Sequence, residues 1–300
     1  MQYVGRFAPT PSGPLHFGSL VTALASWLDA RSHQGKWLVR IEDLDPPREM
    51  PGASDRILQS LEDLCLTWDG PVIYQSQRSE AYSAALKDLQ NQGHAFPCSC
   101  TRKELAGQTL YPGYCHQAPR HPERPLAWRF MVNPELTVEW QDNVQGKQTW
   151  PLKQLGDVVI QRKDGLWAYQ LAVLVDDLEQ GVTHIVRGID LLDSTPWQIN
   201  LLKCLQPKAP DFHYSHLPVI VNAAGQKLSK QNLAPAINSQ QASELLYRAL
   251  LALNQPVEAA WCKEKPESLL KLAVDHWQLE RVPQVAAIQE ESLQTCTSTD

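Results

Sequence analysis

The segment RFAPTPSGPLHFGS, from Arg6 to Ser19, carries the residue types of a phosphate-binding turn. Its prolines and Gly13 exclude regular structure, and a helical pattern of apolar residues begins directly after them. His16, Gly18 and Ser19 therefore fall in the first turn of a helix. A helix N-terminus offers unpaired N–H groups to a phosphate, and a glycine allows a nucleotide to approach the backbone closely. The segment indicates either a nucleotide site or an ordinary strand-to-helix turn with an incidental histidine.

A group of acidic residues, Glu42, Asp43 and Asp45, crowds the end of a strand predicted over residues 36–43. Ligands of parallel sheets bind at the carboxyl ends of the strands, so these side chains are candidates for substrate binding. A solvated acidic loop is the alternative interpretation. We favour the ligand site because Glu42 continues the alternating pattern of the strand instead of following it.

Three cysteines, Cys98, Cys100 and Cys115, lie close together in the sequence. Two cysteines one residue apart and a third after a short loop can enclose a tetrahedral Zn²⁺. The fourth ligand is either His116, the more usual donor, or Tyr111. Three buried free thiols are the alternative, but the spacing favours a metal. No spare general base accompanies the cluster, which indicates a structural role for the zinc.

A parallel sheet is needed to bring the first two groups together. A strand around residues 3–8, the helix after it and the strand over 36–43 form a strand–helix–strand unit typical of such a sheet. A later strand over 217–221 precedes a loop that delivers KLSK, residues 227–230. Between them, Lys163-Asp164-Gly165 predicts a hairpin whose second strand, 166–169, contains Tyr169.

Composition limits the class of protein. The chain has 300 residues, 43% of them hydrophobic and 20% charged, which is typical of a soluble globular protein with two domains or one domain carrying a large insertion. No apolar run is long enough to span a bilayer, and the N-terminus lacks the pattern of a signal peptide, so we expect a cytoplasmic protein and no membrane partner. The net charge of −6 gives no overall sign of nucleic-acid binding. Seven cysteines in such a chain argue against a disulfide framework.

HFGS and KLSK together resemble the HIGH and KMSKS signatures of class I aminoacyl-tRNA synthetases. The glutamyl branch is closer still, since the chain also contains IEDLD at Ile41 to Asp45 and RGID at Arg187 to Asp190. The resemblance covers roughly the first 231 residues. It implies an α/β fold with a Rossmann-type parallel sheet and ATP bound with Mg²⁺ across its carboxyl edge. A histidine and lysines there stabilise the phosphates as the in-line transition state forms.

The resemblance stops early, because only 69 residues follow Gln231. Glutamyl-tRNA synthetases continue into a sizeable helical anticodon-binding region, for which this tail is too short. Together with CxC…YPGYC, the short tail resembles the glutamyl-queuosine tRNA(Asp) synthetase family, a group of truncated paralogues. The resemblance implies a monomer that activates L-glutamate with ATP without tRNA. It also implies transfer of the glutamate to queuosine in the anticodon of tRNA(Asp).

The family's domain organisation implies four segments of this chain. Residues 1–94 would form the first half of the catalytic domain, and residues 95–175 an inserted α+β subdomain that resembles an acceptor-binding domain and contains the zinc site. Residues 176–235 would form the second half, with the KLSK loop. Residues 236–300 would form a small helical module.

The family's functional residues carry over position by position. The implied catalytic residues are His16, Ser19, Lys227 and Lys230. The implied ATP-binding residues are His16, Gly18, Ser19, Lys227, Ser229 and Lys230. The implied glutamate-binding residues are Arg6, Ala8, Thr10, Glu42, Tyr169 and Arg187, with Glu42 for the ammonium and Arg187 for the side-chain carboxylate. The implied zinc ligands are Cys98, Cys100, Tyr111 and Cys115.

Two signatures depart from the family pattern. Ser19 replaces the last residue of HIGH, and Leu228 and Gln231 depart from KMSKS, so Lys230 is the better supported catalytic lysine and Lys227 its helper. Three other functions stay open from the sequence. They are a shortened glutamyl-tRNA synthetase that charges the terminal adenosine of tRNA(Glu), a nucleotidyl transferase for another substrate, and a non-catalytic RNA-binding paralogue.

Overall fold

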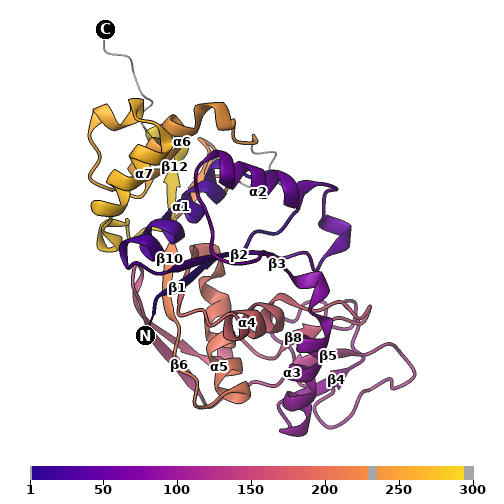
Figure 1. Cartoon of the computed structure of the whole chain (residues 1–300). Coiled ribbons are helices and arrows are strands. Elements are labelled where there is room, and N and C mark those ends of the chain that lie inside the picture. The colour runs from indigo at the N-terminus through magenta and orange to yellow at the C-terminus, as the bar shows by residue number, and fades with distance from the viewer. Residues whose placement is uncertain (1, 229–234, 294–300) are drawn as a thin grey trace.

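A strand–helix–strand unit opens the chain. The computed structural model describes residues 2–228 and 235–293. β1 (Val4–Phe7) and β2 (Lys36–Ile41) pair in parallel, and α1 (Phe17–Ser32) connects them. Both faces of α1 are buried, because the sheet covers one side and the C-terminal helices cover another (Figure 1). The predicted parallel sheet is therefore confirmed at its centre.

Strands from distant parts of the chain extend this sheet. β3 (Ile73–Tyr74) pairs in parallel with β2, and β10 (His213–Leu217) pairs in parallel with β9 (His184–Gly188). β9 lies beside β1, where the Thr183 N–H donates to the Val4 carbonyl at 2.9 Å. The carboxyl ends of these five parallel strands thus lie along one edge, which also carries the start of α1.

Two expected strand positions are wrong by a short distance. Glu42 follows β2 instead of belonging to it, because its N–H turns away to the Pro9 carbonyl. The hairpin around residues 163–165 closes with a single bridge, Gln161 to Trp167, and Tyr169 is the first residue of α4 (Tyr169–Glu179). Each side chain therefore starts from a loop or a helix end at the edge of the sheet.

The segment after α3 (Ser79–Asn91) forms antiparallel structure. β4 (Ala95–Cys98), β5 (Ala127–Phe130) and β8 (Val158–Gln161) make a three-stranded sheet at the end of the molecule opposite α6 (Ala242–Ala252) and α7 (Pro266–Asp275) (Figure 1). β6 (Thr137–Asp142) and β7 (Gly146–Pro151) form a hairpin. The last residue of β6 pairs with Tyr214 of β10, so this hairpin is joined to the central sheet.

The remaining helices divide the core into two main parts. α1 packs with the C-terminal helices in one hydrophobic cluster, and α3, α4 and α5 pack with the antiparallel strands in another. The helices not yet located are α2 (Ala53–Asp63) and α5 (Thr195–Leu205). Short 3₁₀ turns occur at Pro46–Arg48, Gln75–Gln77, Leu152–Gln154, Ile189–Ser194, Ser239–Gln241, Ala259–Lys263, Leu279–Arg281 and Glu290–Ser292.

The tail contains a strand as well as helices. α6 (Ala242–Ala252) and α7 (Pro266–Asp275) pack on α1, and β12 (Ala287–Gln289) pairs in parallel with β11 (Val219–Val221) (Figure 1). The helical patterns predicted these helices, whereas β12 was not expected. Among the residues that the structure describes, no helix has the length and apolar character needed to cross a membrane.

Candidate active site

A cavity of about 530 Å³ lies at the carboxyl edge of the central sheet. Pockets for small molecules typically have volumes of roughly 300–1,000 Å³. Ten of the candidate residues line it, although they come from segments more than 200 positions apart. They are Arg6, Ala8, Thr10, His16, Gly18, Ser19, Glu42, Tyr169, Arg187 and Lys227. Ser229 and Lys230 lie outside the described residues.

The start of α1 forms one wall of the cavity. His16 is the N-cap residue, and its Nδ1 accepts the Ser19 backbone N–H at 3.2 Å. Its Nε2 lies 2.9 Å from the Ser19 hydroxyl, so the bonding pattern of a neutral ring puts the hydrogen on Nε2. A Cβ atom at Gly18 would lie 3.3 Å from the His16 ring, which is tighter than ordinary van der Waals contact. A residue without a side chain therefore fits best between the imidazole and the helix.

The floor of the cavity contains a buried network of charges. Asp177 accepts from Arg6 Nε at 3.1 Å and from Arg40 Nη1 at 2.8 Å. Burial raises the pKa of Asp177, but the two guanidiniums outweigh it and hold that pKa below its ordinary value. Arg6 is therefore oriented from behind by a carboxylate. Sequence reasoning did not identify Asp177; two acidic residues inside the apolar pattern of α4 were the available signal.

Glu42 occupies the acidic corner of the cavity. Its carboxylate accepts from Arg40 Nη2 at 3.4 Å, a long and weak hydrogen bond. Burial raises the pKa of Glu42, and the attraction of Arg40 and Arg6 offsets that effect only in part. A bound cation would stabilise the ionised carboxylate, so this corner is suited to an ammonium group.

Arg187, on β9, forms the basic corner, and only 4% of its surface is exposed. Nη1 donates to the Tyr169 hydroxyl at 3.2 Å, and Nη2 donates to the Thr195 hydroxyl at 2.8 Å. Nε donates to His216 Nε2 at 3.0 Å. Thr195 and His216 do not line the cavity, and sequence reasoning identified neither of them. The guanidinium is thus fixed from the side that faces away from the cavity.

Lys227 reaches the cavity from the loop after β11. Its Nζ forms an ion pair with Asp190 at 2.5 Å, and both side chains are partly exposed. Leu228 N donates to the Ile220 carbonyl, and Ile237 N donates to the Leu15 carbonyl beside His16. The loop is thus held against β11 at Leu228, and Ile237 contacts the residue that precedes His16.

The three clustered cysteines form a second, separate site. The Sγ atoms of Cys98, Cys100 and Cys115 lie within 4.8 Å of one another and are buried. The Tyr111 hydroxyl lies 3.5 Å from Cys98 Sγ and 3.8 Å from Cys100 Sγ. His116 instead pairs through Nε2 with Asp157. Tyr111 therefore lies with the thiols, and this group could hold a metal ion.

Hydrogen bonds and a nearby positive charge surround the cysteine cluster, although burial raises the pKa of Cys100 to about 11. Arg129 Nε donates to Cys98 Sγ at 3.4 Å. Burial opposes ionisation of Cys115, but hydrogen bonds from the Tyr111 hydroxyl and from backbone N–H groups lower its pKa to about 6. Thiolates are the metal-binding form of cysteine, and three of them favour a soft or borderline metal ion.

The chain matches known proteins along almost its whole length. The family model for the catalytic domain of class I tRNA synthetases (E and Q) matches residues 2–111 and 115–286. A Glutamyl-Q tRNA(Asp) synthetase from Pseudomonas entomophila is 51% identical over 97% of this chain and 98% of its own length. The protein of the same name from Pseudomonas aeruginosa is 50% identical over 97% of this chain and 99% of its own.

Solved structures agree with the fold. The crystal structure of a glutamate tRNA ligase from Elizabethkingia meningosepticum, in complex with its amino acid, superposes with a TM-score of 0.82 at 22% identity. The superposition covers 97% of this chain and 68% of that one. At this level of identity the likeness concerns the fold.

Proposed function

The chain belongs to the family of class I tRNA synthetases (E and Q), and from this membership we propose its reaction. It is an enzyme that activates L-glutamate with ATP, without tRNA, and then transfers the glutamate to queuosine in the anticodon of tRNA(Asp). The observation that carries the proposal is the identity of 50–51% to proteins named Glutamyl-Q tRNA(Asp) synthetase, over almost the full length of each.

Glutamate is selected by the two charged corners of the cavity. Arg187 receives the side-chain carboxylate, and Glu42 receives the ammonium group. Arg6, Ala8, Thr10 and Tyr169 complete the wall between them. A site with one charge of each sign favours a zwitterion that carries a second carboxylate, because each buried charge needs a partner of opposite sign.

ATP lies against the start of α1, where its phosphates meet unpaired N–H groups. His16, Gly18 and Ser19 border the α-phosphate, while Lys227, Ser229 and Lys230 serve the β- and γ-phosphates, with Mg²⁺. The α-carboxylate of glutamate attacks the α-phosphorus, the bond to pyrophosphate breaks, and glutamyl-adenylate forms. The positive groups act on the phosphate charge that develops in line with this displacement.

The acceptor is proposed from the names of the relatives. Queuosine carries a cyclopentene diol, and a hydroxyl of that ring attacks the carbonyl carbon of the mixed anhydride as a ribose hydroxyl would. An ester forms, the bond to the phosphate of AMP breaks, AMP leaves, and the hydroxyl proton is released to solvent. The body of the enzyme then engages the anticodon arm of tRNA(Asp). No additional catalytic residue is needed for this transfer.

Zinc is the metal that we propose for the cysteine cluster. Its ligands would be Cys98, Cys100, Tyr111 and Cys115, and its role would be structural. The proposed segments are 1–94, 95–175, 176–235 and 236–300, as expected from the sequence. A cytoplasmic location and a monomeric state also stay predictions.

Two assays test the function. ATP–pyrophosphate exchange with glutamate and no tRNA should proceed, whereas a dependence on tRNA would contradict tRNA-independent activation. Labelled glutamate should be transferred to tRNA(Asp) with queuosine but not to the same tRNA with guanosine. After nuclease digestion the label should stay with the anticodon fragment. Label on the terminal adenosine of tRNA(Glu) would identify a shortened glutamyl-tRNA synthetase instead.

A further inference from the structure

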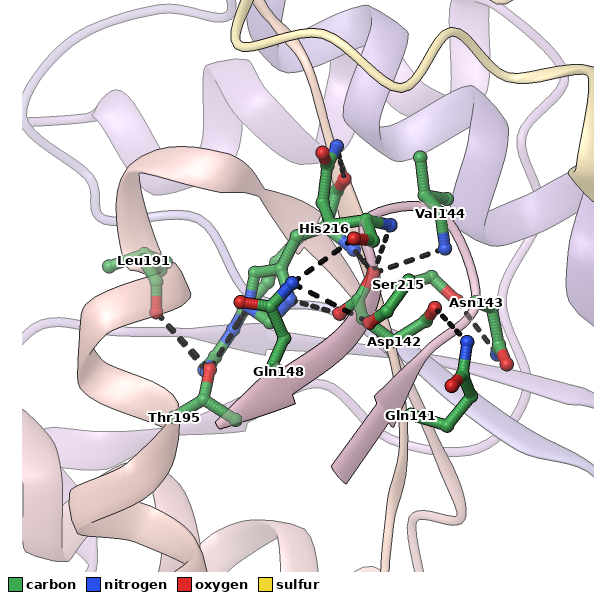
Figure 2. Close-up of polar contacts among 12 residues, drawn as sticks. Gln141, Asp142, Asn143, Val144, Gln148, Leu191, Thr195, Ser215 and His216 are labelled. Atoms are coloured by element: carbon green, nitrogen blue, oxygen red, sulfur yellow. Dashed lines mark hydrogen bonds and ion pairs between the residues drawn. The ribbon is translucent and has the colours of Figure 1, made fainter. Parts of the chain in front are cut away.

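A buried acidic residue from the β6–β7 hairpin lies behind the basic corner of the cavity. Asp142, the last residue of β6, accepts from His216 Nδ1 at 2.5 Å (Figure 2). His216 Nε2 accepts from Arg187 Nε at 3.0 Å. The side chains of Asp142 and His216 are fully buried, so water does not compete for these contacts. A chain of hydrogen bonds thus runs from the hairpin to Arg187.

The hydrogen of the neutral His216 ring can lie on only one of its two nitrogens. A guanidinium has no acceptor atom, so His216 Nε2 must be the unprotonated nitrogen that accepts the Arg187 Nε–H. The hydrogen of the neutral ring then lies on Nδ1 and is donated to Asp142. Burial and the charge of Arg187 lower the pKa of His216, although Asp142 opposes them, which agrees with a neutral ring.

The second oxygen of Asp142 is fixed independently. Oδ1 accepts the backbone N–H groups of Val144, Gln145 and His216 at 2.9–3.1 Å, and Figure 2 shows the carboxylate enclosed by these donors. Because three donors converge on Oδ1, only Oδ2 is left for His216. The orientation of the carboxylate therefore dictates which tautomer the imidazole adopts.

These contacts determine how Arg187 can meet a ligand. A guanidinium can bind a carboxylate side-on through Nε and Nη2 or end-on through both Nη atoms. In this structure His216 occupies the Nε–H and Thr195 contacts Nη2 from the buried side. The Nη1 end lies beside Tyr169, which lines the cavity. A carboxylate in the cavity therefore binds Arg187 end-on, through its Nη groups.

We propose that Asp142 and His216 are positioning residues that hold Arg187 in its binding orientation and thereby determine the selectivity for a substrate carboxylate. The inference rests on the proposed function only for the identity of that carboxylate, the side chain of glutamate. The β6–β7 hairpin thus helps to orient a residue that binds the substrate, although the hairpin itself contributes no residue to the cavity wall.

Asp142→Asn is the sharpest variant, because it keeps the shape of the side chain. The three backbone donors require the amide oxygen at the Oδ1 position, so the NH₂ group faces His216 Nδ1. Nδ1 must then accept, the ring hydrogen moves to Nε2, and it points at the Arg187 Nε–H. Two donors facing each other displace the guanidinium, as expected when an orienting carboxylate is lost.

The first measurement is the tautomer of His216, from the ¹⁵N chemical shifts of the labelled protein. The hydrogen should be on Nδ1 in the unmodified protein and on Nε2 in the Asp142→Asn variant. An imidazolium in the unmodified protein, or the same tautomer in both proteins, would overturn the inference. This measurement requires no activity and is therefore independent of the proposed function.

The second measurement is ATP–pyrophosphate exchange. Asp142→Asn should raise the KM for glutamate by roughly 10–100-fold and the KM for ATP by no more than about twofold. Glu139→Gln, which removes an exposed charge from the same strand, should change neither. An unchanged KM for glutamate, or a parallel rise for both substrates, would mean that Asp142 has only a structural role.

Two substitutions of His216 keep the inference testable if Asp142→Asn does not fold. His216→Gln retains an acceptor for Arg187, whereas His216→Asn retains only a donor for Asp142. The KM for glutamate should be at least about tenfold lower in the Gln variant than in the Asn variant. Equal values would contradict the positioning role. If the unmodified protein shows no exchange with glutamate, the proposed function fails, and the tautomer measurement alone decides the inference.

Discussion

Three buried charged side chains at the cavity are held by partners behind them. Asp177 fixes Arg6, Arg40 contacts Glu42, and His216 contacts Arg187. Burying an ionised group is costly unless it is hydrogen-bonded. These partners therefore offset the cost of keeping Arg6, Glu42 and Arg187 ionised at a buried cavity wall. At the residue scale, the site is therefore preorganised before a ligand arrives.

Replacing Arg187 should abolish selectivity for the substrate side chain. Arg187→Ala removes the charge that faces this carboxylate and should cost about 2–4 kcal/mol in kcat/KM for glutamate, or roughly 30- to 1,000-fold. The same exchange assay on Arg56→Ala, an exposed arginine of α2, is the control and should match the unmodified protein. Glutamine should be a poor substrate of the unmodified protein; equal activation of glutamine and glutamate would contradict the assignment.

Glu42 should make glutamate binding sensitive to acid. Burial raises the pKa of Glu42 above the ordinary glutamate value of about 4.3. As the pH falls, Glu42 is therefore protonated while the side chain of the substrate glutamate is still ionised. Protonated Glu42 no longer attracts the ammonium, and the KM for glutamate should rise with falling pH in that window. Glu42→Gln should have a high KM that lacks this pH dependence.

Because the pKa of Glu42 is raised in the folded protein, the loss of glutamate binding at low pH can be distinguished from acid unfolding. A carboxyl group whose pKa is raised in the folded state is more easily protonated there than in the unfolded chain. Protonation of Glu42 therefore does not itself destabilise the fold as the pH falls. Thermal melts recorded across the same window should show no loss of stability that depends on Glu42; a melting temperature that falls as the KM rises would contradict the interpretation.

At the scale of elements, the segment between β4 and β5 contains little regular structure. Between Cys98 and Ala127 the described chain forms no helix or strand, and the cysteines with Tyr111 lie at its centre. Such a segment buries few apolar side chains, so a bound metal ion would supply much of its stability. The cluster is thus the natural place to test the metal.

Cys98→Ser should lower both metal content and stability. Metal analysis of the purified protein should find about one zinc per chain, because four ligands close one site. The serine variant should bind less zinc and melt at a lower temperature. Cys262→Ser, a half-buried thiol outside the cluster, should keep the metal. A metal-free protein of full stability would leave three buried thiols as the explanation.

At the scale of the whole molecule, the tail belongs to the catalytic core. α6 and α7 pack on α1, and β12 pairs with β11 just before the loop that carries Lys227. Buried Asp29 on α1 accepts from the Tyr3 hydroxyl at 2.5 Å and from Trp277 Nε1 at 3.0 Å. One carboxylate therefore connects the first strand, the central helix and the tail.

Asp29→Ala should destabilise the protein without changing its substrate site. One buried and one partly buried donor would lose their acceptor, and we expect a loss of about 2–4 kcal/mol in the free energy of unfolding. Tyr3→Phe removes only one of the two hydrogen bonds and should cost about 0.5–1.5 kcal/mol. Denaturant titration measures both values. The KM for glutamate should stay unchanged; a rise would mean that Asp29 also acts on the site.

The sequence by itself predicted ten of the residues that line the cavity and the local structure around many of them. The start of α1 follows from prolines, a glycine and an apolar period, all within one short stretch. Glu42 and Tyr169 were predicted to line the site, although each was expected inside a strand. Both strands end earlier, because the backbone there bonds to other segments, and local periodicity contains no information on such bonds.

Only the tertiary structure decided which groups stand behind those residues. Asp142 and His216 are 74 positions apart, and they meet because β6 joins the sheet beside β10. β12 likewise became a strand because β11 offered it a free edge. Local sequence determines which side chains a segment presents, whereas the burial, tautomer and orientation of a side chain depend on partners that packing brings from distant segments.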